Sequence, residues 1–340
     1  MKGQLFDLLQ YLFPFAKVTI ELRRSFYIHL GGRGPNLHHR YGTIAVDLAR
    51  RLLTLSEGDR MDSIGKLAAE FSTGRGTIQS ALKLLVDEGA LQVESLGKRG
   101  YFIKRLDQSV LLEKAELTAI IGAMPVAYST HFQGLATGLN QTFQQSDIPL
   151  ILAMLRGSKN RVHFLKSGRC DFIIISRLTW EGIQQDEALR LLFAFGPGSN
   201  IEGHVLIMAE NNDEDEITDG MRVGIDSSSN DHMRLTLQEC EGKSVQFVEM
   251  SYGQSLQKLL AGEIDATVWD AGAGLHRPPS SLKVLPLIHS NGELDANTEA
   301  VLVVRSDSGG LQDLISQIID PQKVVDTQRK VIAREIQPIF

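Results

Sequence analysis

The sequence has only two cysteines among its 340 residues, Cys170 and Cys240, and they lie far apart. No Cys-x-x-Cys pair occurs, which argues against a structural zinc site or a dithiol redox site, and such sparse cysteine suits a reducing cytoplasm. Long apolar runs are also missing. The stretch LLQYLFPFAKVTI near the start is interrupted by Pro14 and Lys17, is too short to cross a bilayer, and precedes no small-residue cleavage site. We therefore expect a soluble, cytoplasmic protein with no membrane partner.

Motifs of common enzyme classes are absent as well. The glycines of Gly74-Arg75-Gly76 could suggest a phosphate-binding loop, but they follow a helical pattern and no Gly-Lys-Ser/Thr follows them. Neither a Gly-x-Ser-x-Gly elbow nor a His-Glu-x-x-His zinc motif occurs. We expect no catalytic residue, no metal and no cofactor. A catalytic triad assembled from distant residues remains open at this point.

Charge is distributed unevenly along the chain. Residues 1–106 carry 16 Lys and Arg against 10 Asp and Glu, whereas residues 107–340 carry 19 against 31, so a basic front precedes an acidic body. This asymmetry is expected when only one domain meets a polyanion. The length allows two domains with substantial cores. The first 40 residues show no clean period and end in GGRGPNLHHR, so we expect a poorly ordered leader in which the pair His38-His39 is solvated.

The front part of the chain has the periodicity of three helices. Residues 44–55 and 63–71 are each helical in pattern, with Ser63 as a plausible N-cap. In the third helix the apolar residues recur at i, i+3, i+4 and i+7, which predicts one buried stripe: Ile78, Ala81, Leu82 and Leu85. Gly89 is placed to end this helix in the left-handed conformation.

A β-hairpin is expected directly after these helices. The stretch ALQVESLGKRGYFIKRL alternates on both sides of Gly-Lys-Arg-Gly, which predicts two strands with a basic tip. Three helices and a hairpin make a winged helix-turn-helix over residues 41–106, in which one helix enters the major groove and the hairpin tip reaches the DNA backbone. A small three-helix domain that binds protein is the alternative. The polar helix face and the basic tip together favour double-stranded DNA.

The stretch RGTIQSALKLLVDEGALQVESLGKRGYFI resembles the winged-helix half of GntR-type transcription regulators. This resemblance implies that Arg75 and Thr77 contact DNA at the start of the recognition helix. The chain departs from the family at Gly74, where Ser or Thr is usual, and at Gln79, where arginine is common. The expected DNA-binding residues are those of the helix start, the polar helix face and the hairpin tip: Arg75, Thr77, Gln79, Ser80, Lys83, Lys98 and Arg99.

Strand and helix signals alternate from about Leu117 onward, the pattern of α/β structure. One series runs from TAIIGAM to FIIIS and a second from MRVGID to ATVWD. The apolar strands GHVLIMAE and EAVLVVRS lie between and after them. Two α/β lobes joined in this way predict a periplasmic-binding-protein-like fold of the second type over residues 107–340. The whole chain is thus expected to be an α+β multidomain protein.

Three stretches of this rear part resemble YhfZ-type proteins, GntR-class regulators with such a sensor domain: AMPVAYSTHFQGLATGL, LRGSKNRVHFLKSGRCDFIIISRL and SLQKLLAGEIDATVWD. The resemblance covers roughly residues 44 to 335. It implies the architecture and the role of a regulator, and it supplies no effector.

Polar residues recur where strands are expected to end and helices to begin, the positions that line the cleft between two such lobes. Each has a structural alternative as a helix cap, a surface ion pair or a core residue. We expect the ligand site to draw on Ser129, Thr130, Arg156, Ser158, Ser176, Arg177, Asp226, Ser227, Ser228, Tyr252, Trp269 and Asp270. Arg156 and Arg177 are the expected pair for an anionic ligand, since a guanidinium binds carboxylate or phosphate in bidentate fashion. Asp226 would repel a bare anion, so the ligand could also carry a hydroxyl or amine.

Together these features predict a ligand-responsive transcription regulator. One winged helix covers only a short half-site, so a homodimer on a repeated operator is expected. Two alternatives remain: an enzyme acting on a small anionic metabolite in the cleft, and a small-molecule carrier, which the absence of an export signal disfavours.

Overall fold

The computed structural model describes residues 40–146, 148–210, 214–272, 281–289 and 293–340. The expected leader, with His38 and His39, lies outside the described residues. Among those that are described, no helix has the length and apolar character needed to cross a bilayer.

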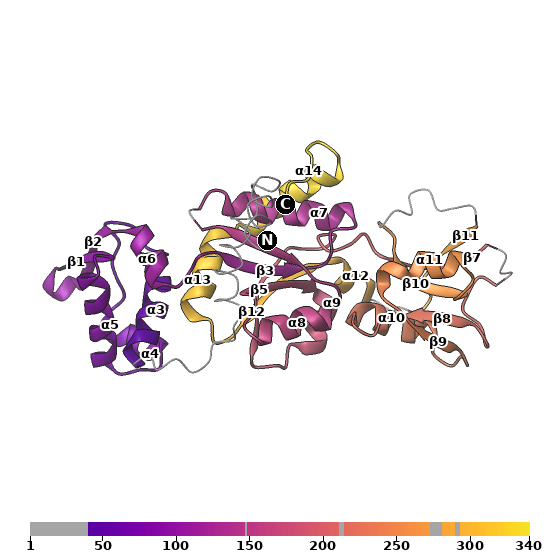
Figure 1. Cartoon of the computed structure of the whole chain (residues 1–340), viewed down its shortest axis with the longest axis horizontal. Helices are drawn as coiled ribbons and strands as arrows, with labels where there is room; N and C mark the ends of the chain where they lie inside the picture. Colours follow the sequence, from indigo (N-terminus) through magenta and orange to yellow (C-terminus); the bar gives the residue numbers. More distant parts are fainter. Residues whose placement is uncertain (1–39, 147, 211–213, 273–280, 290–292) are drawn as a thin grey trace, which may run out of the picture. The chain divides into compact units, whose positions relative to one another are not determined.

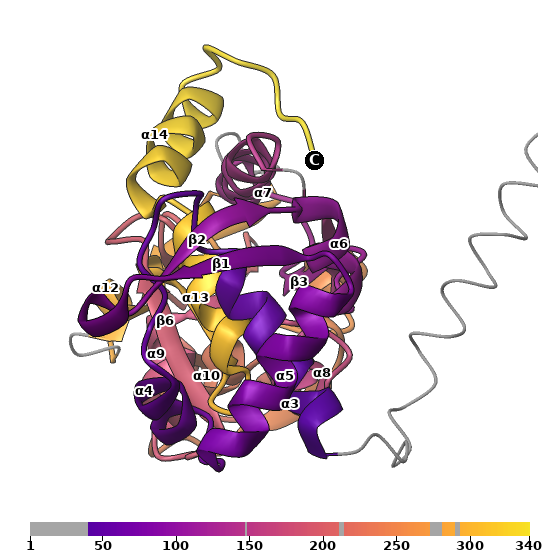
Figure 2. The ribbon, with the colours of Figure 1, turned by 90° about the vertical axis from the view of Figure 1, so that its left-hand side faces the viewer.

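The three expected helices of the front part are present (Figures 1 and 2). They are α3 (Arg40–Leu52), α4 (Ile64–Glu70) and α5 (Arg75–Asp87). Ser63 caps α4 by accepting a hydrogen bond from the Lys66 amide. The predicted stripe of α5 is buried in all four positions. Gly89 follows this helix with φ +78°, the left-handed conformation that ends a helix without a steric penalty in glycine.

The wing is an antiparallel hairpin of β1 (Leu91–Ser95) and β2 (Tyr101–Leu106). Its tip, Gly97–Arg99, forms one turn of 3-10 helix. Helix α6 (Gln108–Lys114) follows and packs against α3, where Arg50 Nε donates to the Ala115 carbonyl at 3.1 Å. The helix-turn-helix and its wing are therefore confirmed as structural elements.

The first lobe is a five-stranded sheet with the strand order β4-β3-β5-β12-β6. Its strands are β3 (Ile120–Met124), β4 (Leu150–Met154), β5 (Phe172–Ser176), β6 (Leu189–Ala194) and β12 (Ala300–Arg305). Alternate residues of β5 enter different cores: Phe172 and Ile174 pack on one face, Ile173 and Ile175 on the other. Helices cover both faces: α7 (Thr130–Phe143), α8 (Ser158–Lys166), α9 (Arg177–Ile183), α13 (Gly309–Ile318) and α14 (Pro321–Ile332).

The second lobe repeats this plan with the strand order β11-β7-β10-β8-β9. Its strands are β7 (His204–Ala209), β8 (Arg222–Ile225), β9 (Gln246–Glu249), β10 (Ala266–Asp270) and β11 (Leu282–Pro286). Helix α10 (Asn230–Glu239) contributes Leu235 to the core on one face, and α11 (Ser255–Leu260) contributes Leu259 to the core on the other.

Both sheets share one topology. In each sheet three strands are parallel, and the first of them in the chain, β3 or β8, lies between the other two. An antiparallel strand, β12 or β7, then pairs with the last parallel strand, and the chain enters this antiparallel strand from the other lobe. The chain crosses between the lobes twice, first through residues 195–203 and then between β11 and β12, where the described residues are 287–289 and 293–299 and include α12 (Glu293–Thr298). This is the two-lobed periplasmic-binding-protein-like fold predicted from the sequence.

Helix α14 is an element that the sequence analysis did not anticipate. It packs against α7, and the side chain of Gln328 is 1% exposed. Its Nε2 donates to the His131 carbonyl at 2.8 Å and to the Ser199 carbonyl at 2.7 Å. This amide thereby links α7 to the first crossing between the lobes.

A close helix contact joins the helix-turn-helix part to the first lobe. Helix α13 packs against α3, and the apolar residues of both helices belong to one hydrophobic cluster. The site of nearest approach is Gly310, where a Cβ atom would lie 2.8 Å from the Asp47 carbonyl oxygen and 2.9 Å from the Arg51 nitrogen. Around it, Gln317 Nε2 donates to the Thr54 carbonyl at 3.1 Å, and Arg51 pairs with Asp313 at 3.5 Å.

This contact predicts that Gly310→Ala destabilises the protein, because the added methyl group meets backbone atoms of α3 that cannot move aside independently. We expect the free energy of unfolding to fall by about 1–3 kcal/mol. Gly309→Ala is the matched control, since a Cβ there meets no atom within 4 Å. Denaturant unfolding of both variants checks this, and equal stabilities would contradict the proposed contact.

Candidate functional site

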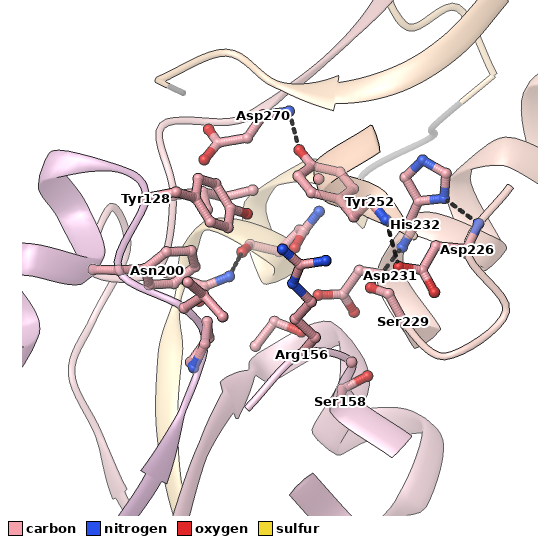
Figure 3. A pocket seen from close by; sticks show the side chains of 18 of the residues that line it. Tyr128, Arg156, Ser158, Asn200, Asp226, Ser229, Asp231, His232, Tyr252 and Asp270 are labelled. Atoms are coloured by element: carbon pink, nitrogen blue, oxygen red, sulfur yellow. Dashed lines mark hydrogen bonds between the residues drawn. The ribbon is translucent and has the colours of Figure 1, made fainter. Parts of the chain in front are cut away.

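A cavity of about 420 Å³ lies between the two lobes (Figure 3). Its walls come from the ends of β4, β5 and β10, from the starts of α8 and α10, and from the crossing segments. This is the region where strand ends and helix starts of both lobes meet, as the fold predicts.

Seven of the twelve residues expected at the ligand site line this cavity. They are Arg156, Ser158, Ser176, Asp226, Tyr252, Trp269 and Asp270. Figure 3 shows the Arg156 guanidinium extending toward the cavity, where its Nη1 donates to Ser251 Oγ at 3.2 Å. These residues come from both lobes and lie together around the cavity.

The other five expected residues have structural roles outside the lining. Ser129 caps α7, whose first residue is Thr130. Ser227 donates to Glu249, and Ser228 donates to Asp226. Arg177 forms an ion pair with Glu299, which raises the pKa of the guanidinium. The structure therefore does not bring Arg177 and Arg156 together around one ligand, because a carboxylate of the second crossing segment already binds Arg177.

Several lining residues were missed by the sequence analysis: Tyr128, Phe132, Arg161, Asn200, His204, Asp231, His232 and Asn297. Asp231 offered one signal, as an acidic residue in the first turn of α10. Asn200 and Asn297 belong to the crossing segments and lie neither directly after a strand nor at the start of a helix. The local sequence pattern therefore gave no indication that they line the cavity.

Contacts across the cleft hold the lobes in a closed arrangement. The Lys159 amide donates to the Ser228 carbonyl at 3.1 Å, and the Asn230 amide donates to Ser158 Oγ at 3.0 Å. Gly157 adopts φ +75°, and a Cβ on it would lie 2.5 Å from Ser228 Oγ. Only glycine fits this backbone conformation and this approach without strain.

Asp270 is a buried ionisable group of the cavity. It ends β10 and is 1% exposed. Its Oδ1 accepts from the Gly272 amide at 2.9 Å, whereas its buried Oδ2 has no hydrogen-bond partner among the described residues. Burial, assisted by the nearby charge of Glu202, raises the pKa of this carboxyl to about 7.

Two further charged groups, Arg161 and Asp231, oppose each other in the lining. Arg161 Nε donates to the Ile174 carbonyl at 3.0 Å and Nη1 to the Leu155 carbonyl at 2.8 Å. Burial lowers the pKa of Arg161 to about 10, still well above neutral pH. Asp231 accepts from Thr179 Oγ1 across the cleft at 2.7 Å, and burial raises the pKa of its carboxyl.

The cavity histidines are neutral and engaged. His232 Nδ1 accepts from the Asp226 amide at 3.0 Å and Nε2 lies 3.1 Å from the Val268 carbonyl, so the proton resides on Nε2. Burial lowers the pKa of His232 to about 4 and that of His204 to about 3. His204 Nδ1 lies 2.5 Å from Asn297 Nδ2, an amide donor. Within the described residues no cluster of three His, Cys, Asp or Glu side chains could hold a metal ion.

The second candidate site is the exposed surface of the helix-turn-helix and wing. Arg75, Gln79, Ser80 and Lys83 are exposed along α5, and Thr77 is half-buried at its start. Arg99 is exposed at the wing tip, while the side chain of Lys98 lies outside the described ones. None of the ion pairs found among the described residues involves Arg75, Lys83 or Arg99, so these charges remain available to an anionic partner.

The fold and these two sites define a class of protein that combines a helix-turn-helix domain with a binding-protein-like α/β domain. Family models agree: a helix-turn-helix domain matches residues 56–103, and the YhfZ C-terminal domain matches residues 107–340. The chain therefore belongs to the YhfZ family.

Individual proteins show the same relationship. The protein YhfZ of Escherichia coli (strain K12) is 32% identical over 299 residues, which cover 88% of this chain and 97% of that one. The crystal structure of YhfZ from Shigella flexneri, at 29% identity, has a TM-score of 0.55 and covers 67% of this chain and 96% of that one. An ancestral arginine-binding protein bound to arginine reaches a TM-score of 0.47 at 15% identity, covering 64% and 97%.

The raised pKa of Asp270 predicts a pH dependence of stability. Because the folded-state pKa lies above the unfolded value, protonation of this carboxyl favours the folded state, and stability is lost progressively as pH rises from the ordinary carboxyl pKa of 3.8 to about 7. Asp270→Asn, which keeps the acceptor for Gly272, should therefore raise the free energy of unfolding at pH 8 by on the order of 2 kcal/mol, with little gain at about pH 4. Unfolding of the unliganded parent and variant by denaturant at both pH values measures this, and a gain of equal size at the lower pH would refute it.

Proposed function

We propose that this protein is a transcription regulator that binds duplex DNA through its helix-turn-helix and wing, and senses a small metabolite in the cavity between its lobes. The observation that carries the proposal is the conjunction of two sites in one chain: exposed basic side chains on a helix-turn-helix that form no ion pair with any described residue, and a polar cavity walled by two lobes. As a DNA-binding protein it would act in the cytoplasm.

We propose a division of the chain in which residues 41–106 read DNA and residues 107–340 sense the effector. The contacts to DNA are assigned to Arg75, Thr77, Gln79, Ser80, Lys83, Lys98 and Arg99, of which Gln79 and Ser80 face the bases and the wing faces phosphates. This arrangement of recognition helix and wing is the basis for the proposed GntR-like mode of binding.

A homodimer is part of the proposal. One helix-turn-helix covers too few base pairs for useful specificity, whereas two on a repeated operator supply it. Ligand would alter DNA binding by favouring one arrangement of the lobes over another, which requires tighter binding to that arrangement. Sedimentation of the full chain measures the dimer.

The effector is proposed to carry an anionic group that meets Arg156, whose guanidinium extends toward the cavity. Arg177 is left out of this proposal because Glu299 already neutralises it. The alternative from the sequence, an enzyme acting on a small anionic metabolite in the same cavity, has no observation of its own in its favour.

For DNA binding, we expect the double change Lys98→Ala and Arg99→Ala to weaken binding to all duplexes. It should also reduce the slope of log affinity against log salt by about two, because each lost phosphate contact releases about one counterion fewer. Gln79→Ala should instead change the preferred sequence, by about 1–3 kcal/mol at the affected base pair. Salt titrations and selection from random duplexes measure both effects. Lys323→Ala, at an exposed side chain of α14, is the control, and variants indistinguishable from it would refute the assignment.

For ligand binding, we expect Arg156→Ala to remove the thermal stabilisation that carboxylated or phosphorylated metabolites give the parent, since binding only to the folded state raises its stability. The unliganded melting temperature and DNA binding without effector should stay nearly unchanged, because Arg156 is an exposed side chain outside the core. A thermal-shift screen of both proteins tests this. A compound that stabilises both equally would place the ligand elsewhere.

A further inference from the structure

The strongest unexplained feature of the cavity is the free side of the Asp270 carboxylate. Oδ1 is satisfied by the Gly272 amide, but Oδ2 is buried, unpartnered among the described residues, and belongs to a side chain that lines the cavity. A buried acceptor with no donor costs stability, and a buried carboxylate costs more unless a positive charge or a proton compensates it.

Among the described residues, the two arginines that line the cavity are engaged with other groups. Arg161 donates to two backbone carbonyls and interacts electrostatically with Asp231, and Arg156 donates to Ser251. The charged side chain that acts on Asp270 in this part of the structure is Glu202, which has the same sign. A Cβ on Gly272 would lie 3.4 Å from Asp270 Oδ1 and 3.5 Å from Glu202 Oε2, so two carboxylates lie close together beside Gly272.

Aromatic side chains form the wall beside this carboxylate. Tyr252 stacks on Trp269 with ring centroids 4.5 Å apart and planes within 4°, and Tyr128 lies 5.8 Å from Tyr252. The Asp270 amide donates to the Tyr252 hydroxyl oxygen, which fixes that ring beside the strand end. Figure 3 shows the Asp270 carboxylate beside Tyr128. Aromatic rings attract cations without adding a formal charge, so this wall favours a positively charged group.

We propose that Asp270 binds a protonated amine of the effector, through an ion-paired hydrogen bond to Oδ2 beside the aromatic wall of Tyr128, Tyr252 and Trp269. The inference rests on the proposed function and deepens it, because it names the group that is recognised beside Asp270. With an anionic group at Arg156, the effector is a small metabolite that carries both charges. A hydroxyl could donate to the same oxygen, but it would leave the carboxylate charge uncompensated.

The experiment uses matched pairs of compounds that differ only in this group. Thermal shifts of the full chain are measured with L-amino acids and with the L-2-hydroxy acids of the same side chains, and with amino-sugar phosphates and the phosphates of the parent sugars. Calorimetry then gives the affinity of each stabilising pair. We expect at least one amine to bind at least about tenfold more tightly than its hydroxy counterpart, as a charged hydrogen bond exceeds a neutral one by this amount or more.

Two variants locate the preference. Asp270→Asn should reduce the amine-to-hydroxyl affinity ratio to near one. Asp231→Asn is the matched control: it makes the same change in the same cavity, but at a carboxylate that already accepts from Thr179. It should weaken both members of a pair alike and leave their ratio intact. The unliganded melting temperature of each variant is recorded first, and if Asp270→Asn does not fold, the ratio in the parent protein decides.

The outcomes distinguish a failure of the amine site from a failure of the proposed sensing function. If carboxylates or sugar phosphates stabilise the parent and no amine exceeds its hydroxy counterpart, the amine site is refuted and the sensing cavity stands. An unchanged ratio in Asp270→Asn likewise refutes it. If no compound in the panel stabilises the parent, both the amine site and small-molecule sensing of this kind are overturned.

Discussion

The closed cavity depends on the carboxylate of Asp226. Its Oδ1 accepts from the amide and hydroxyl of Ser228, and its Oδ2 accepts from the Tyr252 amide. One side chain therefore links the loop after β8 to the 3-10 turn Tyr252–Gln254, which follows β9. The Ser228 carbonyl that this loop presents is the acceptor for the Lys159 amide of the other lobe. Closure is therefore built on an acidic residue whose acceptor atoms are used within its own lobe. This explains how an aspartate can line a proposed anion site without facing the anion.

Sequence periodicity predicted most of the fold. The buried stripe of α5, the Ser63 cap, the hairpin and the strands β5 and β10 follow from local pattern, because each has one or two faces whose burial dictates the residue type. Helices α13 and α14 and the strand β11 were not predicted. Their positions are decided by docking against α3, α7 and β7, contacts between segments far apart in the chain.

The candidate site shows the same division between local pattern and distant contacts. Seven of the residues chosen by their position at strand ends or helix starts line the cavity, because the topology brings these ends together. The ion pair of Arg177 could not be predicted from the sequence, since its partner Glu299 is 122 residues away. Asp270 was singled out by its position, but that its Oδ2 has no hydrogen-bond partner among the described residues is a property of the packed structure.

The crossing segments carry a small polar network of their own. Asn200 Nδ2 donates to the Asn297 carbonyl at 2.8 Å, and Gln328 holds the Ser199 carbonyl. The second crossing is bonded to the second lobe as well, because the Ile288 and His289 amides donate to the Glu239 carboxylate of α10 at 3.1 and 2.8 Å. Each lobe therefore holds part of the crossings, and a rearrangement of the lobes would have to be taken up between these two anchor points.

The contact between α3 and α13 limits the modularity of the molecule. Because Gly310 leaves room for the α3 backbone, and the apolar residues on both sides share one cluster, the surface that receives the helix-turn-helix part lies on a helix close to the far end of the chain. Exchange of one helix-turn-helix and wing for another by recombination directly after β2 would separate α3 from its complementary surface. Diversification of this architecture thus requires α3 and α13 to change together, although about 260 residues of chain lie between them.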